Sequence, residues 1–424
     1  MPIEKKHYQV LIIGGGTGGI WTAAKLSREN PHLDIGIIEP SKDHYYQPAW
    51  TLVGAGTYDI EDSRRDMKSV IPYGVDWIQD KAMSFDPKNN KVTTAKNGSY
   101  TYDYLVVAVG VQYDYSLIEG LEEAFEKGVV CSNYIDPEYT WECIQNFKGG
   151  NALFTQPNTP IKCAGAPQKA AYLMADYLLK ESPDKDYEMI YAAPVPAIIG
   201  VKEIAKTLMK VIERYNIQFG TFYAPVKINA DKKIAYFKNI TPKGEEQTQR
   251  KLDLNRIGAS EDKEGLISVP FDFLHIAPPQ VAPDAIRNSE LANKEGWLEV
   301  HDHSLQHLKY DNVFGIGDVA GIPNVKSGSA IKFQVPVVVD NILKLQNNQK
   351  ADNLDYQGYS ACPVVTGYKK AVLAEFDYEN NFTPDPNLKK MLVFNSAKEH
   401  WRLWLLKKYG LPYMYWTKML TGEM

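Results

Sequence analysis

The chain has few cysteines, no long hydrophobic run and no excess of positive charge. Four cysteines in 424 residues are too few for a secreted scaffold that disulfides hold together. No apolar run reaches the roughly 18–20 residues that a membrane-spanning helix needs, and the mean hydropathy of −0.35 agrees. With 47 basic and 52 acidic residues the net charge is −5, which argues against a nucleic-acid-binding protein.

The remaining composition is that of a folded protein. Hydrophobic residues make up 44% and charged residues 23%, which excludes wholesale disorder. The length predicts roughly two or three domains. The N-terminus enters a strand pattern almost at once, leaving no room for a signal or transit peptide. We therefore expect the chain to stay in the compartment where it is made.

The first motif is a glycine-rich turn between a predicted strand and a predicted helix. Residues 8–13 form an apolar run typical of a buried strand. Gly14, Gly16 and Gly19 then fit the G-x-G-x-x-G pattern, and residues 20–26 favour a helix. The glycines allow a tight turn, close approach to a pyrophosphate and close helix–strand packing. The helix N-terminus favours phosphate.

A second predicted strand strengthens this motif. Residues 34–38 are apolar and lead directly into Glu39. At this spacing an acidic side chain meets a ribose 2′-hydroxyl in dinucleotide-binding folds. The alternative is a strand–turn–helix unit without a ligand, which the glycine turn alone does not exclude.

Two later strands make the pattern resemble the flavoproteins with two dinucleotide-binding domains. Residues 102–110 end at Gly110, and residues 312–318 end at Asp318. In that family the first segment passes near the flavin, and the matching aspartate binds the ribityl chain. The resemblance implies FAD as cofactor. As isolated strands, the two segments would carry little information.

The second nucleotide motif of that family is missing. The predicted strand at 151–156 precedes a loop with Pro157 and Pro160, and a helix begins near Pro167. Prolines fix φ and remove N–H donors, which is the opposite of what a pyrophosphate site needs. We therefore predict that NAD(P)H is not the electron donor. Cys163 lies in the loop where that nucleotide would bind.

The residue types alone leave the role of the cysteines open. Cys163 and Cys362 lie far apart, and the chain has no close C-x-x-C pair. It also has no Cys/His cluster with zinc spacing, so we predict no metal site. From spacing alone, each cysteine is either a small core residue or a catalyst.

Longer strings resemble the sulfide:quinone oxidoreductase family, in its mitochondrial type. The resemblance covers nearly the whole chain. Its most specific strings are residues 44–56, 154–169, 273–279, 312–328 and 362–378.

This resemblance implies a redox reaction. In the family, two cysteines that match Cys163 and Cys362 form a disulfide or a sulfur-bridged trisulfide over one face of FAD. Sulfide opens the bridge and leaves a persulfide on Cys362, and two electrons pass through FAD to a quinone on the opposite face. The sulfane sulfur goes to an acceptor such as sulfite, glutathione, cyanide or sulfide. These steps suit the chemistry of thiolates and flavins.

Four further residues are carried over by resemblance. Gln47 matches an FAD contact, and Lys326 is expected to touch the flavin. Lys169 is placed to lower a thiolate pKa, or it is an ordinary solvated helix lysine. Glu123 falls where relatives have an acid near the sulfide site, or it is a surface carboxylate.

The other cysteines are departures or core residues. Cys131 lies roughly where another branch of the family has a third working cysteine, and we expect it to be a buried, incidental thiol. Cys143 is expected in the core, on a predicted helix over residues 137–147. Val319 stands where relatives can have cysteine, with no obvious mechanistic effect.

The last 27 residues (398–424) predict a membrane surface contact. They contain Trp, Tyr and Leu ringed by basic residues, a composition typical of the interfacial layer. Gly410 and Pro412 predict a break into two short helices. The alternative is a helix packed on its own protein. The basic residues expected to face headgroups are Lys398, Arg402, Lys407, Lys408 and Lys418.

A quinone must be drawn from the bilayer, so aromatic residues are expected along its channel. Phe333 is the first candidate, and Tyr413 and Tyr415 are further ones. The resemblance implies a peripheral protein on the cytoplasmic face of a bacterial inner membrane, or on the mitochondrial inner membrane. It leaves a homo-oligomer open.

The predicted fold is α/β, with two Rossmann-like domains and C-terminal membrane-associating helices. Residues 1–148 and 290–350 form the FAD-binding domain, and residues 149–289 form a second Rossmann-like domain. Residues 351–424 carry Cys362 and the membrane helices. Three alternative functions remain: a type-II NADH:quinone oxidoreductase, a sulfide dehydrogenase that reduces a cytochrome, and a flavin-binding scaffold protein.

Overall fold

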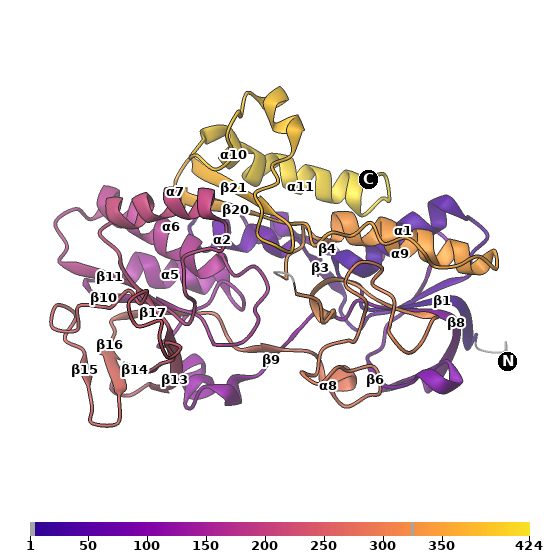
Figure 1. Cartoon of the computed structure of the whole chain (residues 1–424), viewed down its shortest axis with the longest axis horizontal. Helices are drawn as coiled ribbons and strands as arrows, with labels where there is room; N and C mark the ends of the chain where they lie inside the picture. Colours follow the sequence, from indigo (N-terminus) through magenta and orange to yellow (C-terminus); the bar gives the residue numbers. More distant parts are fainter. Residues whose placement is uncertain (1–4, 324–325) are drawn as a thin grey trace.

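The computed structural model describes residues 5–323 and 326–424, and the first domain is built on a seven-stranded sheet (Figure 1). Strands pair in the order β5-β2-β1-β8-β7-β6. β19 pairs with residues 105–107 of β8, beyond residues 99–101, which pair with β7. All pairs are parallel except those that β7 makes. The strands are β1 (His7–Ile13), β2 (Ile35–Ile38), β5 (Asp76–Ile78), β6 (Ala82–Asp86), β7 (Lys91–Thr94), β8 (Ser99–Val107) and β19 (Val313–Gly315).

Two long helices lie against this sheet: α1 (Thr17–Glu29) and α9 (Ile331–Gln346). Their apolar side chains share one buried cluster with β1 and β2, because β1 is apolar on both faces. The predicted strand at 8–13 and the helix at 20–26 are confirmed. β8 ends at Val107, so the predicted strand 102–110 leaves the sheet before Gly110.

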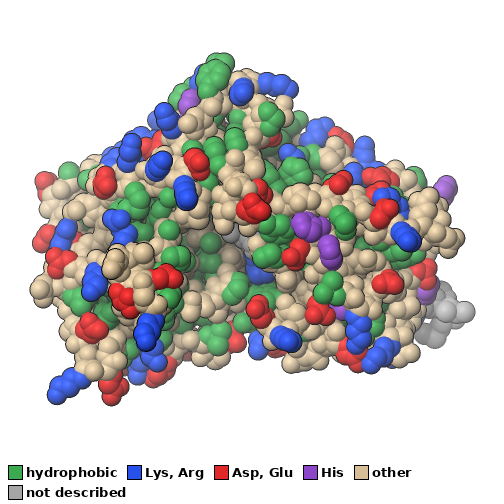
Figure 2. Space-filling model, in the orientation of Figure 1, with side chains coloured by type: hydrophobic (Ala, Val, Ile, Leu, Met, Phe, Trp, Pro, Cys, Tyr) green, Lys and Arg blue, Asp and Glu red, His purple; other side chains and the backbone are tan. Residues whose placement is uncertain are grey.

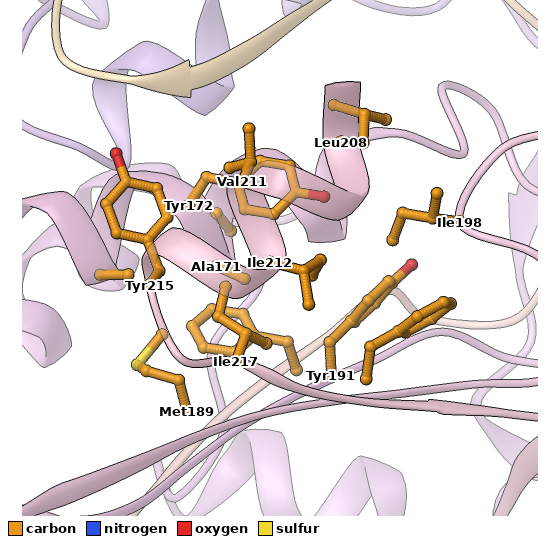
Figure 3. Close-up of a cluster of buried hydrophobic side chains, with 14 of the residues drawn as sticks. Ala171, Tyr172, Met189, Tyr191, Ile198, Leu208, Val211, Ile212, Tyr215 and Ile217 are labelled. Carbon is orange, nitrogen blue, oxygen red and sulfur yellow. The ribbon is translucent and has the colours of Figure 1, made fainter. Parts of the chain in front are cut away.

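The second domain has a four-stranded parallel sheet in the order β12-β11-β10-β17. Helices α6 and α7 pack their apolar faces onto it, as Figure 3 shows for Tyr172, Tyr191, Leu208 and Ile212. The elements are β10 (Gly150–Thr155), β11 (Tyr187–Ala193), β12 (Gln218–Thr221), β17 (Phe273–Ile276), α6 (Ala166–Glu181) and α7 (Lys202–Arg214).

A small antiparallel sheet completes this domain, in the order β13-β14-β16-β15. The short pair β9–β18 lies between the two domains (Figure 1). Ile144 and Phe147, at the end of α5, belong to the second domain's core, so that core includes residues before 149. The elements are α4 (Leu121–Glu126), α5 (Pro137–Asn146), β9 (Gln112–Tyr113), β13 (Tyr223–Asn229), β14 (Ile234–Asn239), β15 (Ser260–Glu261), β16 (Leu266–Pro270) and β18 (Gln280–Val281).

Short elements and a hairpin connect the domains to the C-terminal region. The hairpin β20–β21 packs on α6, which brings its side chains to the second domain. The bounds are β3 (Asp43–Tyr45), η1 (Gln47–Ala49), α2 (Trp50–Val53), β4 (Arg64–Asp66), α3 (Met67–Val70), α8 (Asp284–Arg287), β20 (Ser360–Gly367) and β21 (Lys370–Phe376).

The tail is one continuous helical segment, so the predicted break is wrong. Regular turns alternate with π-helical turns, and both Gly410 and Leu411 have right-handed helical dihedrals. Pro412 lies where α11 follows a π turn, and the chain stays helical through it. The preceding π turn widens the helix. The segments are α10 (Trp401–Leu405), η7 (Leu406–Gly410), α11 (Leu411–Met414) and η8 (Tyr415–Met419).

No helix in the described ranges is both long enough and apolar enough to cross a bilayer.

Candidate functional site

The glycine turn between β1 and α1 has the geometry of a phosphate-binding loop. Gly14 has a φ of +104°, and a Cβ there would lie 2.4 Å from the Ala108 carbonyl oxygen. A Cβ on Gly19 would lie 1.8 Å from the Gly14 carbonyl oxygen. A Cβ on Gly16, at the N-terminus of α1, would meet nothing within 4 Å. Gly14 and Gly19 are therefore required by packing, and Gly16 faces open space where a pyrophosphate fits.

Glu39 and Gly110 border the same turn. The Glu39 carboxylate accepts hydrogen bonds from the Gly15 and Ser41 main-chain N–H groups, both at 2.7 Å. Each carboxylate oxygen keeps a further lone pair for a ribose hydroxyl. Gly110 has a φ of +68° and open space around its Cα, as a loop that passes close to a ligand requires.

The tail helix is fastened to this turn by Tyr415. Its hydroxyl lies 2.9 Å from Thr17 Oγ1 and 2.6 Å from His44 Nε2, and His44 Nδ1 lies 2.9 Å from the Gly15 carbonyl oxygen. Burial lowers the pKa of His44 to about 4, so the imidazole is neutral at pH 7. The sequence analysis gave no sign of this connection.

Asp318 and Lys326 lie together at the carboxyl end of β19. The Lys326 ammonium donates to the carbonyl oxygens of Asp318 (2.6 Å) and Ala320 (3.2 Å) and sits 3.7 Å from the Trp297 ring centroid. Burial lowers the pKa of Lys326 to about 8, with Asp318 opposing the shift. Burial also raises the pKa of Asp318, against the charges of Lys162 and Lys326. Asn324 and Val325, in the same motif, lie outside the described residues.

The loop from β10 to α6 holds Cys163 in an unusual backbone conformation. Cys163 has a φ of +51°, a left-handed conformation that a non-glycine residue rarely adopts. Its N–H donates to the Lys326 carbonyl oxygen at 2.6 Å, and its carbonyl oxygen accepts from the Tyr134 hydroxyl at 3.0 Å. The cysteine is therefore tied to the loop that carries Asp318.

The fold brings Cys163 and Cys362 together. Cys362, on β20, packs against α6, and a single ammonium group, that of Lys169, reaches both sulfurs. Its Nζ lies 3.1 Å from Cys163 Sγ and 3.7 Å from Cys362 Sγ. Lys169 is only 1% exposed, so it is not the solvated helix lysine of the alternative interpretation. Both cysteines are free thiols in the structure.

The electrostatics of this pair distinguish the two thiols. A hydrogen bond from Cys362, reinforced by the charge of Lys169, lowers the pKa of Cys163. The same hydrogen bond and burial raise the pKa of Cys362. Burial lowers the pKa of Lys169, but negative charge on the two sulfurs outweighs it and raises that pKa above its ordinary value. Cys163 is thus the stabilised thiolate of the pair.

Lys407 is a member of this site that the sequence analysis missed. We expected it to face headgroups, which is wrong: it is 2% exposed, and its Nζ donates to the Pro48 carbonyl oxygen at 2.5 Å. Burial and the charge of Lys169 lower its pKa to about 7, and charge on the thiols opposes this. No motif marks Lys407, because the width of turn η7 decides which way it points.

Gln47 also reaches the cysteine loop. Its Oε1 accepts from Lys162 Nζ at 2.7 Å, and Lys162 N donates to Gln280 Oε1 at 2.8 Å. Residue 47, from the first domain, is therefore in contact with the residue that precedes Cys163. The predicted FAD contact lies beside the predicted redox cysteine.

Other predicted residues lie in different surroundings. Glu123, on α4, is exposed and pairs with Lys127 at 2.6 Å, and none of its described contacts leads to the cysteine pair. Phe333, on α9, is partly exposed, with its ring centroid 4.4 Å from that of Tyr359. Tyr413 is 63% exposed on the tail.

The two remaining cysteines lie against each other. Cys131 is buried, and its thiol donates to the Leu274 carbonyl oxygen at 3.6 Å. Cys143, on α5, is partly exposed and forms a hydrogen bond with Cys131 that lowers the Cys143 pKa. Burial raises the pKa of Cys131. Val319 is buried. The described residues contain no cluster of three or more side chains that could hold a metal.

Comparisons with known proteins agree with this geometry. Residues 8–140 match the pyridine nucleotide-disulphide oxidoreductase family. The mitochondrial sulfide:quinone oxidoreductase of Mus musculus is 38% identical over 99% of this chain and 87% of its own length. The X-ray structure of the sulfide:quinone oxidoreductase from Aquifex aeolicus superposes with a TM-score of 0.76 at 22% identity, over 98% of this chain and 92% of that one.

A type II NADH:quinone oxidoreductase from Staphylococcus haemolyticus is 34% identical, but over only 27% of this chain and 29% of its own length. The similarity to the mouse relative, by contrast, extends over 420 residues and 99% of this chain. The chain therefore belongs to the sulfide:quinone oxidoreductase family.

Proposed function

We propose that this chain oxidises hydrogen sulfide at Cys163 and Cys362 and passes two electrons through FAD to a quinone. One observation carries the proposal: two cysteines from distant parts of the chain share a buried ammonium group, Lys169, beside the loop of Asp318. A buried lysine beside two half-buried thiols has no packing purpose, since burying a charge is costly unless it is paired.

FAD is the cofactor of this family, and the described residues fit it. Gly14, Gly16 and Gly19 leave room for the pyrophosphate, and Glu39 lies at the ribose position. Asp318 would hold the ribityl chain, and Gly110, Gln47 and Lys326 would be its further contacts with the cofactor. When bound, FAD accepts an electron pair from thiols and delivers it to a quinone.

The sulfur chemistry proceeds by exchange at the cysteine bridge. Hydrosulfide attacks the Cys362 sulfur of the disulfide, the S–S bond breaks, and Cys163 leaves as a thiolate. The outer sulfur on Cys362 then passes to an acceptor such as sulfite, glutathione, cyanide or another sulfide, which leaves a second thiol. Re-forming the Cys163–Cys362 bridge from the two thiols gives up two electrons and two protons, for which bound FAD would be the acceptor.

The two buried lysines favour these steps. Cys163 is the better leaving group of the pair because its pKa is the lowered one. The charges of Lys169 and Lys407 lie close to both sulfurs and attract the hydrosulfide anion. Burial lowers the pKa of Lys407 to about 7, so its amino group is only partly protonated at pH 7, and its direct hydrogen bond is to the Pro48 carbonyl oxygen. Of the proposed catalytic residues, Glu123 has the least structural support, since its carboxylate forms an ion pair with Lys127.

The tail supports peripheral attachment to a membrane. Trp401, Leu405, Tyr409 and Tyr413 are all exposed and follow one another at intervals of four residues. An α-helix has about 3.6 residues per turn, so this spacing would drift around it, but the π turns widen the helix and keep the four on one face. Aromatic residues of this kind sit at headgroup depth.

The quinone candidates lie at different depths behind that face. Phe333, one residue before the Gln334 that holds Gly317, is near the Asp318 loop and is partly exposed. Tyr413 is on the membrane stripe, and Tyr415 is engaged at the glycine turn. We propose a path from the stripe past Phe333, on the cytoplasmic face of a bacterial inner membrane or on the mitochondrial inner membrane. A homo-oligomer is compatible with this arrangement.

Anaerobic titration of the purified protein tests the proposal. Sulfide should bleach the flavin absorbance and a quinone analogue should restore it, whereas NADH should have no effect. Cys163→Ser and Cys362→Ser should each keep FAD and lose the bleaching by at least about a thousandfold, because no bridge can form. Cys143→Ser is the matched control and should titrate like the parent. Bleaching by NADH alone, or full activity of either serine variant, would contradict the mechanism.

A further inference from the structure

A cavity of about 640 Å³ lies on the outer side of the second domain, between α7 and residues 382–398. Its wall is apolar on one side, formed by Phe382, Leu388, Val393 and Phe394. It is separate from the cysteine site and from the glycine turn, neither of which contributes a lining residue. Nothing in the redox mechanism uses it.

Four lysines surround this cavity. Lys206 and Lys210 lie one turn apart on α7, and Lys389 and Lys398 face them from the other wall. All four are exposed, and within residues 5–323 and 326–424 none has an ion-pair partner, although Glu203 and Asp385 also line the cavity. Like charges one turn apart repel each other, so an anion between these ammonium groups relieves the repulsion.

The position of α7 explains why the cations face outward. Its apolar residues, among them Leu208, Val211 and Ile212, point into the core (Figure 3). Thr207 Oγ1 donates to the Ala397 carbonyl oxygen at 2.6 Å and ties α7 to the opposite wall. Ser396, also in the wall, has a buried hydroxyl without a hydrogen-bond partner among the described residues. The cavity therefore has both charge and a free polar group to offer.

Two exposed apolar side chains lie at or beside the rim of the cavity. Phe394 is 77% exposed and Leu392 is 55% exposed. Exposing large apolar side chains to water is unfavourable, and such exposure marks interaction sites. Arg214 of α7 pairs with Glu399 at 2.7 Å, directly before α10 begins. Glu399 is the only carboxylate between residues 386 and 418. Figure 2 shows hydrophobic side chains beside Lys and Arg on the crest that this region forms.

We propose that this cavity binds the phosphate of an anionic phospholipid while Leu392 and Phe394 enter the bilayer. The lysines supply the charge that an anionic headgroup needs, and the exposed apolar rim calls for a lipid rather than a soluble phosphate. The cavity is then a second membrane contact, on the second domain, in addition to the tail. This inference rests on the membrane attachment in the proposed function.

Vesicle binding of the full-length holoprotein tests the inference. We compare phosphatidylcholine vesicles with vesicles that also contain phosphatidylglycerol. Lys206→Gln with Lys210→Gln should weaken binding to the anionic vesicles about 30-fold and leave binding to phosphatidylcholine unchanged. Lys232→Gln with Lys243→Gln, in exposed loops of the small antiparallel sheet, removes the same charge and should have a much smaller effect. Phe394→Ser should weaken binding to both kinds of vesicle.

The outcomes separate the inference from its parent proposal. If both pairs of substitutions weaken binding equally, the lysines act only through the net charge of the protein, and the headgroup site is overturned. Glycerol 3-phosphate that binds the cavity in solution but leaves vesicle binding unchanged at millimolar concentration would assign the cavity to a soluble phosphate and overturn it as well. If the parent protein binds neither kind of vesicle, membrane attachment itself is wrong, whereas sulfide bleaching in solution would still stand.

Discussion

The proposed chemistry of this protein depends on a few side chains whose ordinary properties are changed by burial. Lys169 is a helix lysine by sequence, yet the fold excludes it from water and places it against two sulfurs. Cys163 is a loop cysteine, yet the hydrogen bond from Cys362 and the charge of Lys169 make it the thiolate of the pair. The string around Cys163 identified the residue, but its protonation state follows from distances that only the folded chain has.

Lys169→Met should slow the alkylation of Cys163. Removing the ammonium charge raises the pKa of Cys163, so less thiolate is present at pH 6.5 and the profile of rate against pH moves to higher pH. We expect a rate about tenfold lower at pH 6.5 in the reduced holoprotein, measured with iodoacetamide and peptide mass spectrometry. Lys180→Met, on the exposed side of the same helix, should react like the parent. Equal rates in all three proteins would exclude Lys169 as a stabiliser of the thiolate.

At the scale of elements, the tail helix is the most informative part of the chain. Its composition suggested either membrane contact or packing on the protein, and the structure shows that one helix presents two faces. The inner face carries Lys407 to the Pro48 carbonyl oxygen and Tyr415 to the glycine turn, and the outer face carries the apolar stripe. The π turns decide this division, and no sequence pattern predicted them.

Tyr415→Phe should loosen FAD. The change removes the hydroxyl that meets Thr17 and leaves His44 Nε2 buried without a partner, at a cost of about 1–3 kcal/mol. The temperature at which flavin fluorescence appears on heating should fall. Tyr413→Phe, on the exposed face, should not change it. An unchanged release temperature for Tyr415→Phe would show that the tail does not support the glycine turn.

Leu405→Ser combined with Tyr409→Ser should release the protein from membranes. Both side chains are exposed on the outer face of the tail, and losing their burial in the interface should weaken partition to vesicles by at least about tenfold. Bleaching by sulfide in solution should persist, because neither residue touches the cysteine site. Leu308→Ser, exposed on the first domain, serves as control. Loss of bleaching together with membrane binding would mean that the variant misfolds the site instead.

At the scale of the molecule, the chain joins two domains of the nucleotide-binding type, and the second domain lacks the glycine turn. Pro157 and Pro160 replace that turn, and the loop that follows delivers Cys163 to the first domain through the Lys326 carbonyl. Each domain also buries a neutral histidine: His44 in the first, and His275 in the second, where burial lowers its pKa to about 3.

These two histidines should make the whole protein less stable at mildly acidic pH. Both have folded pKa values below the unfolded value of about 6.5, namely about 4 for His44 and about 3 for His275. The unfolded chain therefore takes up more protons as pH falls below 6.5, and stability falls with it. At pH 5 the loss is about 2 kcal/mol for each histidine.

The measurement is the thermal release of FAD at pH 7 and pH 5. We expect a lower release temperature at pH 5 and a smaller difference in His275→Gln, whose side chain still accepts from the Asn133 N–H group. Between pH 7 and pH 8 the two histidines contribute no change. A release temperature that is the same at pH 7 and pH 5 would contradict the burial of both imidazoles as neutral groups.

The resemblance to a family, and no local pattern, singled out Cys163 and Cys362 as redox candidates. The sequence by itself determined the glycine turn, the parallel strands beside it and the missing second nucleotide motif. These features are local, since they depend on short-range sterics and on apolar patterns within a few residues. Tertiary structure alone decided that Lys407 and Tyr415 point inward, that Cys131 meets Cys143, and that a lysine-lined cavity lies beside α7. Such facts depend on helix turn width and on contacts between residues far apart in the chain, which local patterns do not encode.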